Sequence, residues 1–248
     1  MKKILGKLDK LLFFNFLTKI YLKFLIYQTR KYIKNYSYLR IFKINSQNNE
    51  FSELCEKYLT DKGGLKENLD SRNFHFYSQF YYEYFQKKKR NIKLIFECGI
   101  GTPNKNIKSN TARKGKPGAS LRVLREYFKN AHIYAADIDK NILFEDERIS
   151  TFYVNQLDNQ SINEMWRKIN KNNFDLIIDD GLHTLNSAYA FFNQSFSKLR
   201  PEGLYVIEDV HVAYLRDLVK KLEDFKPKIL TSDKANNIDD YLIIIEKD

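Results

Sequence analysis

From Phe51 onward, the chain alternates short apolar runs with longer amphipathic stretches. Strand patterns fall at 92–96, 132–136, 151–154, 174–178 and 204–207, and two more follow at 228–231 and 241–246. Helical patterns lie between the first five runs and after them, at 120–128, 161–169, 187–199 and 214–225, and two further helices are expected at 51–58 and 74–86. This alternation predicts an α/β protein with a seven-stranded, Rossmann-like sheet and helices on both faces.

The first fifty residues follow a different pattern. Leu, Ile and Phe recur near helical spacing through residues 1–35, with lysines throughout, which predicts a basic amphipathic arm over 1–50 ahead of a second unit, 51–248. Lys19 and Lys23 interrupt the apolar run, which is shorter than the roughly 20 residues of a membrane span. Two interpretations stay open: residues 1–35 contact an anionic membrane surface peripherally, or the arm packs on the second unit or across a homo-oligomer interface.

Charge is distributed unevenly along the chain. The net charge is +11, but the first fifty residues hold eleven Lys or Arg against Asp9 and Glu50, so the remainder carries only +2. The body is therefore nearly neutral, which argues against a nucleic-acid partner. The two cysteines, Cys55 and Cys98, have neither a disulfide framework nor metal-ligand spacing, and this predicts a cytoplasmic location.

Acidic residues follow the predicted strands. They are Glu97, Asp137, Asp180, Glu208 and Asp209. A single acid in such a place is often only a helix cap. Because ligands of open α/β sheets bind at the carboxyl ends of the strands, the convergence of these acids on one edge predicts a ligand site there.

Two motifs at this edge carry candidate chemistry. The turn from Glu97 to Gly101, ECGIG, allows close approach of a ligand to the backbone, and Glu97 suits a ligand ammonium. The run Asp179 to His183, DDGLH, joins carboxylates and an imidazole, a set suited to Mg²⁺, Mn²⁺ or Ca²⁺ with His183 as the base. The alternative is that Asp180 only caps the next helix and His183 only lines a loop.

Together, the runs FECGIGTPN, GKPGASLRVLREYF, IYAADIDKNILFEDERISTFYVNQLD, FDLIIDDGLHT and GLYVIEDV resemble class I S-adenosylmethionine-dependent methyltransferases. Within that class they are most similar to the metal-dependent sugar O-methyltransferases of the macrocin and mycinamicin type, from bacterial polysaccharide and macrolide pathways. The upstream YLTDKGG and FHFYSQFYYEYF are similar to a segment that precedes the sheet in those enzymes. The resemblance covers roughly residues 58–210.

The resemblance implies roles at matching positions. The cofactor-binding residues would be Glu97, Gly99, Gly101 and Ser120 around the methionyl and sulfonium end, Asp137 on the ribose, Gln156 near the adenine, and Asp179. The ligands of Mg²⁺ (or Mn²⁺) would be Asp180, Glu208 and Asp209, with Asp180 and His183 as the catalytic residues and His183 as general base. Asn155 departs from the pattern, since many relatives have an acid there near the adenine.

The resemblance also implies an O-methyltransferase that acts on a sugar hydroxyl, of a hexose or heptose, free or nucleotide-activated, in bacterial capsule or surface polysaccharide biosynthesis. Residues 103–118 form a basic insertion, expected either as a surface loop or as a lid that grips acceptor phosphate. The alternatives are an O-methyltransferase for a phenol or phosphoryl-type oxygen, and a nucleotide-sugar-binding protein without methyl transfer. A protein built around a membrane-docking arm is a further possibility.

Overall fold

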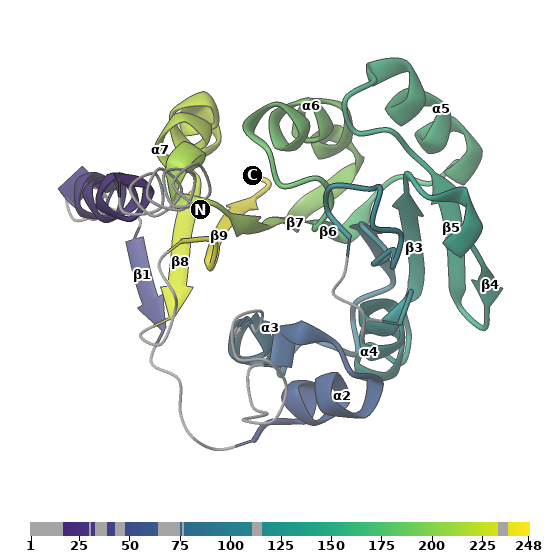
Figure 1. The fold of residues 1–248 in the computed structure, drawn as a ribbon. Helices are drawn as coiled ribbons and strands as arrows, with labels where there is room; N and C mark the ends of the chain where they lie inside the picture. Colours follow the sequence, from purple (N-terminus) through teal and green to yellow (C-terminus); the bar gives the residue numbers. More distant parts are fainter. Residues whose placement is uncertain are drawn as a thin grey trace, which may run out of the picture.

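The computed structural model describes residues 17–29, 31–32, 39–42, 48–63, 75, 77–110, 116–232 and 238–248. A single mixed sheet crosses the molecule with helices on both of its faces (Figure 1), as the α/β pattern predicts. Residues 1–16, 30, 33–38 and 43–47 of the predicted arm and residues 111–115 of the predicted lid lie outside the described residues, so the expectations for them stay predictions.

The elements follow the predicted alternation closely. The strands are β1 (Leu39–Phe42), β2 (Leu94–Cys98), β3 (His132–Asp137), β4 (Glu145–Asp146), β5 (Ile149–Tyr153), β6 (Phe174–Asp179), β7 (Leu199–Val210), β8 (Lys228–Ser232) and β9 (Tyr241–Glu246). The labelled helices are α2 (Glu50–Tyr58), α3 (Tyr77–Phe85), α4 (Ala119–Tyr127), α5 (Asn159–Ile169), α6 (Leu185–Ser195) and α7 (Val212–Lys221). Helix α6 ends before 199, because residues 196–198 form a 3₁₀ turn and Leu199 already pairs with β6.

The sheet has nine strands among the described residues, in the order β1-β8-β9-β7-β6-β2-β3-β5-β4, and not the predicted seven. The seven predicted strands form its continuous centre. One short strand is added at each edge of this centre: β1 pairs parallel with β8, and the two-residue β4 pairs antiparallel with β5. Among the seven central strands, only β9 runs against its neighbours, β7 and β8, while β7, β6, β2, β3 and β5 are mutually parallel.

Alternation along the parallel strands divides the core into two layers. In β2, Ile95 packs with residues of α2, α3 and α4, whereas its neighbour Phe96 packs with residues of α5, α6 and α7. Figure 1 shows the same division, with the two sets of helices on opposite faces of the sheet. Glu97 follows Phe96 and therefore points to the face of α4, because successive side chains of a strand alternate.

The arm contributes to this fold through two described pieces. Residues 17–29 form a helix that lies beside α7 (Figure 1), and its Thr29 hydroxyl donates to the Val212 carbonyl at 3.4 Å. Strand β1 extends the sheet. The described part of the arm is thus packed on the second unit, one of the two interpretations left open by the sequence. No helix among the described residues has both the length and the apolar character needed to traverse a bilayer.

Candidate active site

The glycine turn after β2 packs directly on the end of β6. The Asp180 N–H donates to the Cys98 carbonyl at 2.9 Å, and Gly99 lies at φ +97°. A Cβ at Gly99 would approach the Asp180 carbonyl oxygen to 2.0 Å. Only glycine fits this position, which brings the predicted cofactor turn and the DDGLH run together.

Asp180, His183 and Asp209 form an open cluster at the ends of β6 and β7. His183 Nε2 lies 3.9 Å from Asp180 Oδ1 and 3.8 Å from Asp209 Oδ2, and one ligand atom from each residue falls within 4.8 Å of the others. His183 and Asp209 both have φ +53°, and β7 shifts register between Ile207 and Val210. Such backbone irregularities re-aim side chains and collect at functional sites.

A lysine from outside the sheet forms an ion pair with Asp180 of this cluster. Lys62 lies in the short 3₁₀ turn Asp61–Gly63, and its Nζ lies 2.6 Å from Asp180 Oδ2. Burial opposes ionisation of Asp180, but Lys62 and His183 hold the pKa of that carboxyl below its usual range. Since Lys62 takes Oδ2, Oδ1 of Asp180 is left facing His183.

Glu208, one of the predicted metal ligands, is buried, and both of its carboxylate oxygens are bonded to other side chains. Its Oε2 pairs with Lys62, and its Oε1 accepts the hydroxyl of Tyr81. Glu208 is 1% exposed and is not one of the residues whose ligand atoms cluster around His183. The structure therefore brings together Asp180, Asp209 and His183 as predicted, and places Glu208 behind them with both oxygens bound by the protein.

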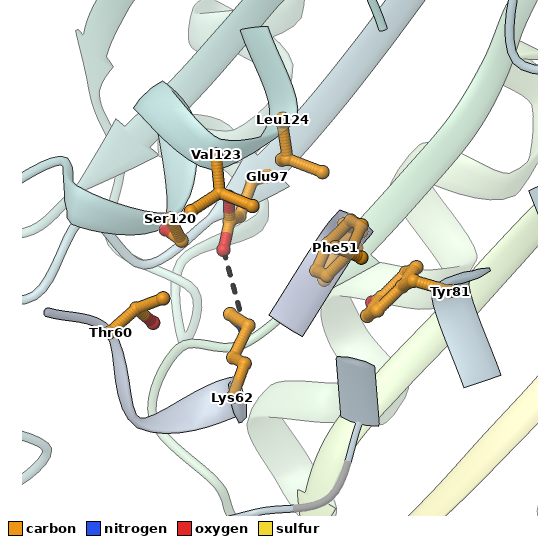
Figure 2. A pocket seen from close by; sticks show the side chains of 9 residues that line it. Phe51, Thr60, Lys62, Tyr81, Glu97, Ser120, Val123 and Leu124 are labelled. Carbon is orange, nitrogen blue, oxygen red and sulfur yellow. Dashed lines mark ion pairs between the residues drawn. The ribbon is translucent and has the colours of Figure 1, made fainter. Parts of the chain in front are cut away.

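Glu97 lines a small pocket under α4, together with Ser120, Lys62 and Tyr81 (Figure 2). The carboxylate is fully buried, and neither oxygen has a hydrogen-bond partner of good geometry among the described residues. Lys62 Nζ is 3.4 Å from Oε1. Burial raises the pKa of Glu97 to about 7 even though Lys62 opposes this shift. An under-satisfied buried carboxylate of this kind fits a ligand ammonium.

A second buried cation lies on the other side of the cluster. Burial lowers the pKa of His75, but the carboxylates of Asp209 and Asp240 outweigh it and raise that pKa to about 10. His75 Nδ1 is 2.5 Å from Asp240 Oδ1 and 3.4 Å from Asp209 Oδ1. The Tyr77 hydroxyl donates to the same Asp209 oxygen at 2.7 Å. Asp209 is thus held on one oxygen, and Oδ2 faces His183.

The remaining predicted cofactor residues are partly engaged with one another. Asp137, at the end of β3, accepts the N–H groups of Ile100 and Asp139 at 2.8 and 2.9 Å. Gln156 donates to Asp179 at 2.6 Å and accepts the Leu182 N–H at 2.7 Å, so it clamps the DDGLH loop. This contact explains the closeness of Gly181, whose added Cβ would lie 2.1 Å from Gln156.

Asn155, which departs from the family pattern, forms hydrogen bonds at the turn between β5 and α5. Its side-chain oxygen accepts the Leu157 N–H at 3.1 Å, and its N–H donates to Ser161 at 2.9 Å. The side-chain oxygen of Asn155 and both ends of the Gln156 amide are therefore bonded within the protein, and the predicted position of these residues near the adenine stays a prediction.

Lys62, His75, Tyr77 and Tyr81 were not among the predicted site residues. All four lie between β1 and β2 in the chain, in the 3₁₀ turn Asp61–Gly63, in α3 or just before it, and they meet Asp180, Glu208 and Asp209 at the strand ends. Two sequence signals were available: all four residues lie in the runs YLTDKGG and FHFYSQFYYEYF, which resemble the relatives, and Tyr77 and Tyr81 are four residues apart and so share a helix face. Neither signal indicates which acids Lys62 pairs with, because its partners are distant in the chain.

The order of the seven central strands, the single reversed strand β9, the glycine turn after β2 and the acid that ends β3 define a class I methyltransferase fold. The MycE methyltransferase of the mycinamycin biosynthetic pathway, solved in complex with Mg and SAH, has this fold: it superposes with a TM-score of 0.53 at 28% identity, over 70% of this chain and 40% of that one. The complex that also holds mycinamycin VI superposes at a TM-score of 0.59 with 22% identity, covering 82% of this chain and 56% of that one.

Curated relatives narrow the class. Demethylmacrocin O-methyltransferase of Streptomyces fradiae is 30% identical over 165 residues, which are 66% of this chain and 37% of the relative. Mycinamicin VI 2''-O-methyltransferase of Micromonospora griseorubida is 29% identical, over 68% of this chain and 38% of the relative. No protein-family model matches the chain.

These relatives confirm the predicted resemblance to sugar O-methyltransferases of the macrocin and mycinamicin type, and the α/β fold class with it. The curated relatives are all named O-methyltransferases, the class of enzyme that the sequence predicts for this chain. The chain spans less than half the length of the curated relatives it matches.

Proposed function

We propose that this chain is an S-adenosylmethionine-dependent, Mg²⁺-assisted O-methyltransferase that acts on a sugar hydroxyl. One observation carries the proposal: a buried carboxylate pocket for an ammonium, at Glu97, lies next to the Asp180–His183–Asp209 cluster. Lys62 touches both Glu97 and Asp180 and so joins the two sites. Relatives that methylate antibiotic sugars support the same interpretation.

The residues around the pocket fit the cofactor. Glu97 and Ser120 would hold the methionyl end, with Gly99 and Gly101 allowing the sulfonium to approach the backbone. Asp137 at the end of β3 would accept the ribose hydroxyls. When bound, S-adenosylmethionine supplies an electrophilic methyl group, whose bond to sulfur breaks as the bond to the acceptor oxygen forms.

The cluster fits a hard divalent cation. Asp180 Oδ1 and Asp209 Oδ2 both face the shared space near His183, and carboxylate oxygens are preferred by Mg²⁺ and Mn²⁺. Bound there, the ion would lower the pKa of an acceptor hydroxyl. Glu208, the third predicted ligand, would have to exchange Lys62 or Tyr81 for the ion.

The protein's own part in the reaction is positioning and proton removal. His183 is 27% exposed at the side chain and faces the cluster, so its imidazole can receive the hydroxyl proton as the methyl group is transferred. Lys62 and His75 orient the carboxylates from behind. Holding acceptor and cofactor in line supplies much of the rate enhancement.

The acceptor is placed by analogy alone. The relatives act on rhamnosyl, olivosyl and macrolide-linked sugars of antibiotics. A hexose or heptose of a bacterial surface polysaccharide, free or nucleotide-linked, and a phosphate-gripping role for the basic insertion 103–118 remain predictions. A cytoplasmic location and a homo-oligomer are likewise part of the proposal and follow from the sequence.

Two measurements test this function against the alternatives. S-adenosylhomocysteine should raise the melting temperature of the protein, whereas NAD and UDP- or GDP-sugars alone should not; the reverse pattern would indicate a nucleotide-sugar binder. Labelled S-adenosylmethionine offered with a panel of sugars, nucleotide sugars and phenols should label a carbohydrate. Transfer to phenols alone would contradict a sugar acceptor.

A further inference from the structure

The helix over residues 17–29 presents apolar side chains on two opposite faces. Its inner face meets the protein: Leu22 and Ile26 pack on the core layer that contains α7, and Thr29 is buried against Val212. Its outer face carries large apolar side chains in solvent. These residues, the outer stripe, are Leu17, Ile20, Tyr21, Phe24 and Tyr27, with exposed fractions of 46, 48, 62, 54 and 63%.

The outer stripe is one continuous surface. Its members follow one another at spacings of three, one, three and three residues, so they share one side of the helix. Elsewhere in the described chain, large exposed apolar residues such as Leu59, Leu157 and Phe225 are scattered over different elements. Single exposed apolar residues are ordinary, but a contiguous stripe marks an interaction surface.

Positive charge accompanies the stripe. Lys23 borders the stripe beside Ile20 and Tyr27, and Lys19 lies one turn before Lys23; both lysines are exposed. The first fifty residues carry a net charge of +9. An apolar stripe bordered by lysines fits the interface of an anionic bilayer, where the apolar groups enter the acyl boundary and the ammonium groups reach lipid phosphates. A second copy of this strongly basic arm would instead meet its partner with like charge.

From this arrangement we infer that the outer stripe docks the protein on the surface of an anionic lipid bilayer, with the 17–29 helix lying parallel to the membrane. The inner face keeps its contacts with α7 in this arrangement, so docking requires no unfolding. The inference is independent of the methyl-transfer chemistry, because Asp180, His183 and Asp209 lie at the ends of β6 and β7 and not on this helix.

Vesicle binding by the full chain tests the inference. The protein should co-sediment with vesicles of phosphatidylcholine mixed with phosphatidylglycerol, and much less with phosphatidylcholine alone. The triple variant L17S/I20S/F24S should lose this binding, and K19E/K23E should weaken it by roughly thirtyfold or more. High salt should weaken binding by the wild type.

A matched control variant makes the same two Lys-to-Glu changes on another part of the protein surface. Lys168 and Lys171 are exposed at and beyond the end of α5, far along the sheet from the arm (Figure 1), and K168E/K171E should bind anionic vesicles as the wild type does. All variants alter exposed side chains, and an unchanged thermal melt verifies their fold. Absence of binding to anionic vesicles, or equal losses in K19E/K23E and K168E/K171E, would overturn the inference. So would a wild-type dimer that the triple variant converts to monomer, since that result assigns the stripe to a second copy.

Discussion

Lys62 and Asp180 are 118 residues apart in the chain, yet the lysine Nζ lies 2.6 Å from Asp180 Oδ2. The same ammonium pairs with Glu208 and lies 3.4 Å from Glu97. Lys62 is therefore the counter-ion shared by the proposed cofactor pocket and the proposed metal site. With Lys62 on one oxygen of Asp180, the other is aimed at the space beside His183.

Replacing Lys62 should destabilise the protein strongly. Lys62→Met leaves the buried carboxylates of Glu97 and Glu208 and the half-buried Asp180 without their common cation, and an uncompensated buried charge costs about 3–5 kcal/mol. Lower pH allows these carboxylates to be protonated, so the loss of unfolding free energy should be larger at alkaline than at acidic pH. Urea unfolding of the variant and the wild type, both with chelator present to remove bound metal, measures this change in unfolding free energy. Lys57→Met, which removes an exposed ion pair with Glu126, is the control and should change little.

Removing His183 should affect the chemical step and not cofactor binding. His183 supplies the imidazole of the Asp180–His183–Asp209 cluster, and general-base catalysis typically contributes about 10²–10⁴-fold. His183→Ala should therefore lower kcat by that factor while the affinity for S-adenosylhomocysteine, measured by calorimetry, stays at the wild-type value. An unchanged kcat would exclude His183 as the base.

Removing Asp209 should weaken metal binding. Asp209→Asn removes a negative charge from the cluster while keeping the side-chain size. It should lower Mn²⁺ affinity by about a hundredfold or more, which is a larger loss than is typical for a residue that only hydrogen-bonds to a metal ligand. Electron paramagnetic resonance of free Mn²⁺ measures this directly. Asp158→Asn alters an exposed helix cap away from the cluster and serves as the control. Equal Mn²⁺ affinity in the two variants would contradict the proposed site.

Cofactor binding should depend on pH through Glu97. Its pKa is raised to about 7, so below that pH the carboxyl is protonated and cannot attract an ammonium. The affinity for S-adenosylhomocysteine should rise as pH increases through about 7 and level off above it. Glu97→Gln should bind at least about thirtyfold more weakly at alkaline pH and lose this pH dependence. A flat profile in the wild type would argue against Glu97 as the ammonium partner.

The sequence predicts the central sheet well because its signal is local. Strand β9 occupies the predicted residues, and β3 ends at the predicted Asp137, since buried apolar runs and strand-end acids are recognised within a few residues. The edge strands β1 and β4 were missed because four and two residues carry no periodicity that can be recognised.

The candidate site was predictable only in part. Asp180, His183 and Asp209 follow strands of the sheet, and ligands of such sheets bind at the strand ends, so the amino-acid sequence suffices to group these three residues. Lys62 and His75 reach the same place from a segment outside the sheet, and their pairing with Asp180 and Asp209 depends on tertiary packing. The bonding of both Glu208 oxygens likewise depends on tertiary packing, because their partners are Lys62 and Tyr81.

The most direct test of the account is formation of S-adenosylhomocysteine from S-adenosylmethionine in the presence of a sugar acceptor, measured with Mg²⁺ and with EDTA. The wild type should turn over with Mg²⁺, stop in EDTA and recover when Mg²⁺ is restored, and with Mg²⁺ present His183→Ala should be at least about a hundredfold slower than the wild type. Full turnover in EDTA, or acceptor-dependent turnover that His183→Ala leaves unchanged, would contradict metal-assisted methyl transfer at the Asp180–His183–Asp209 cluster.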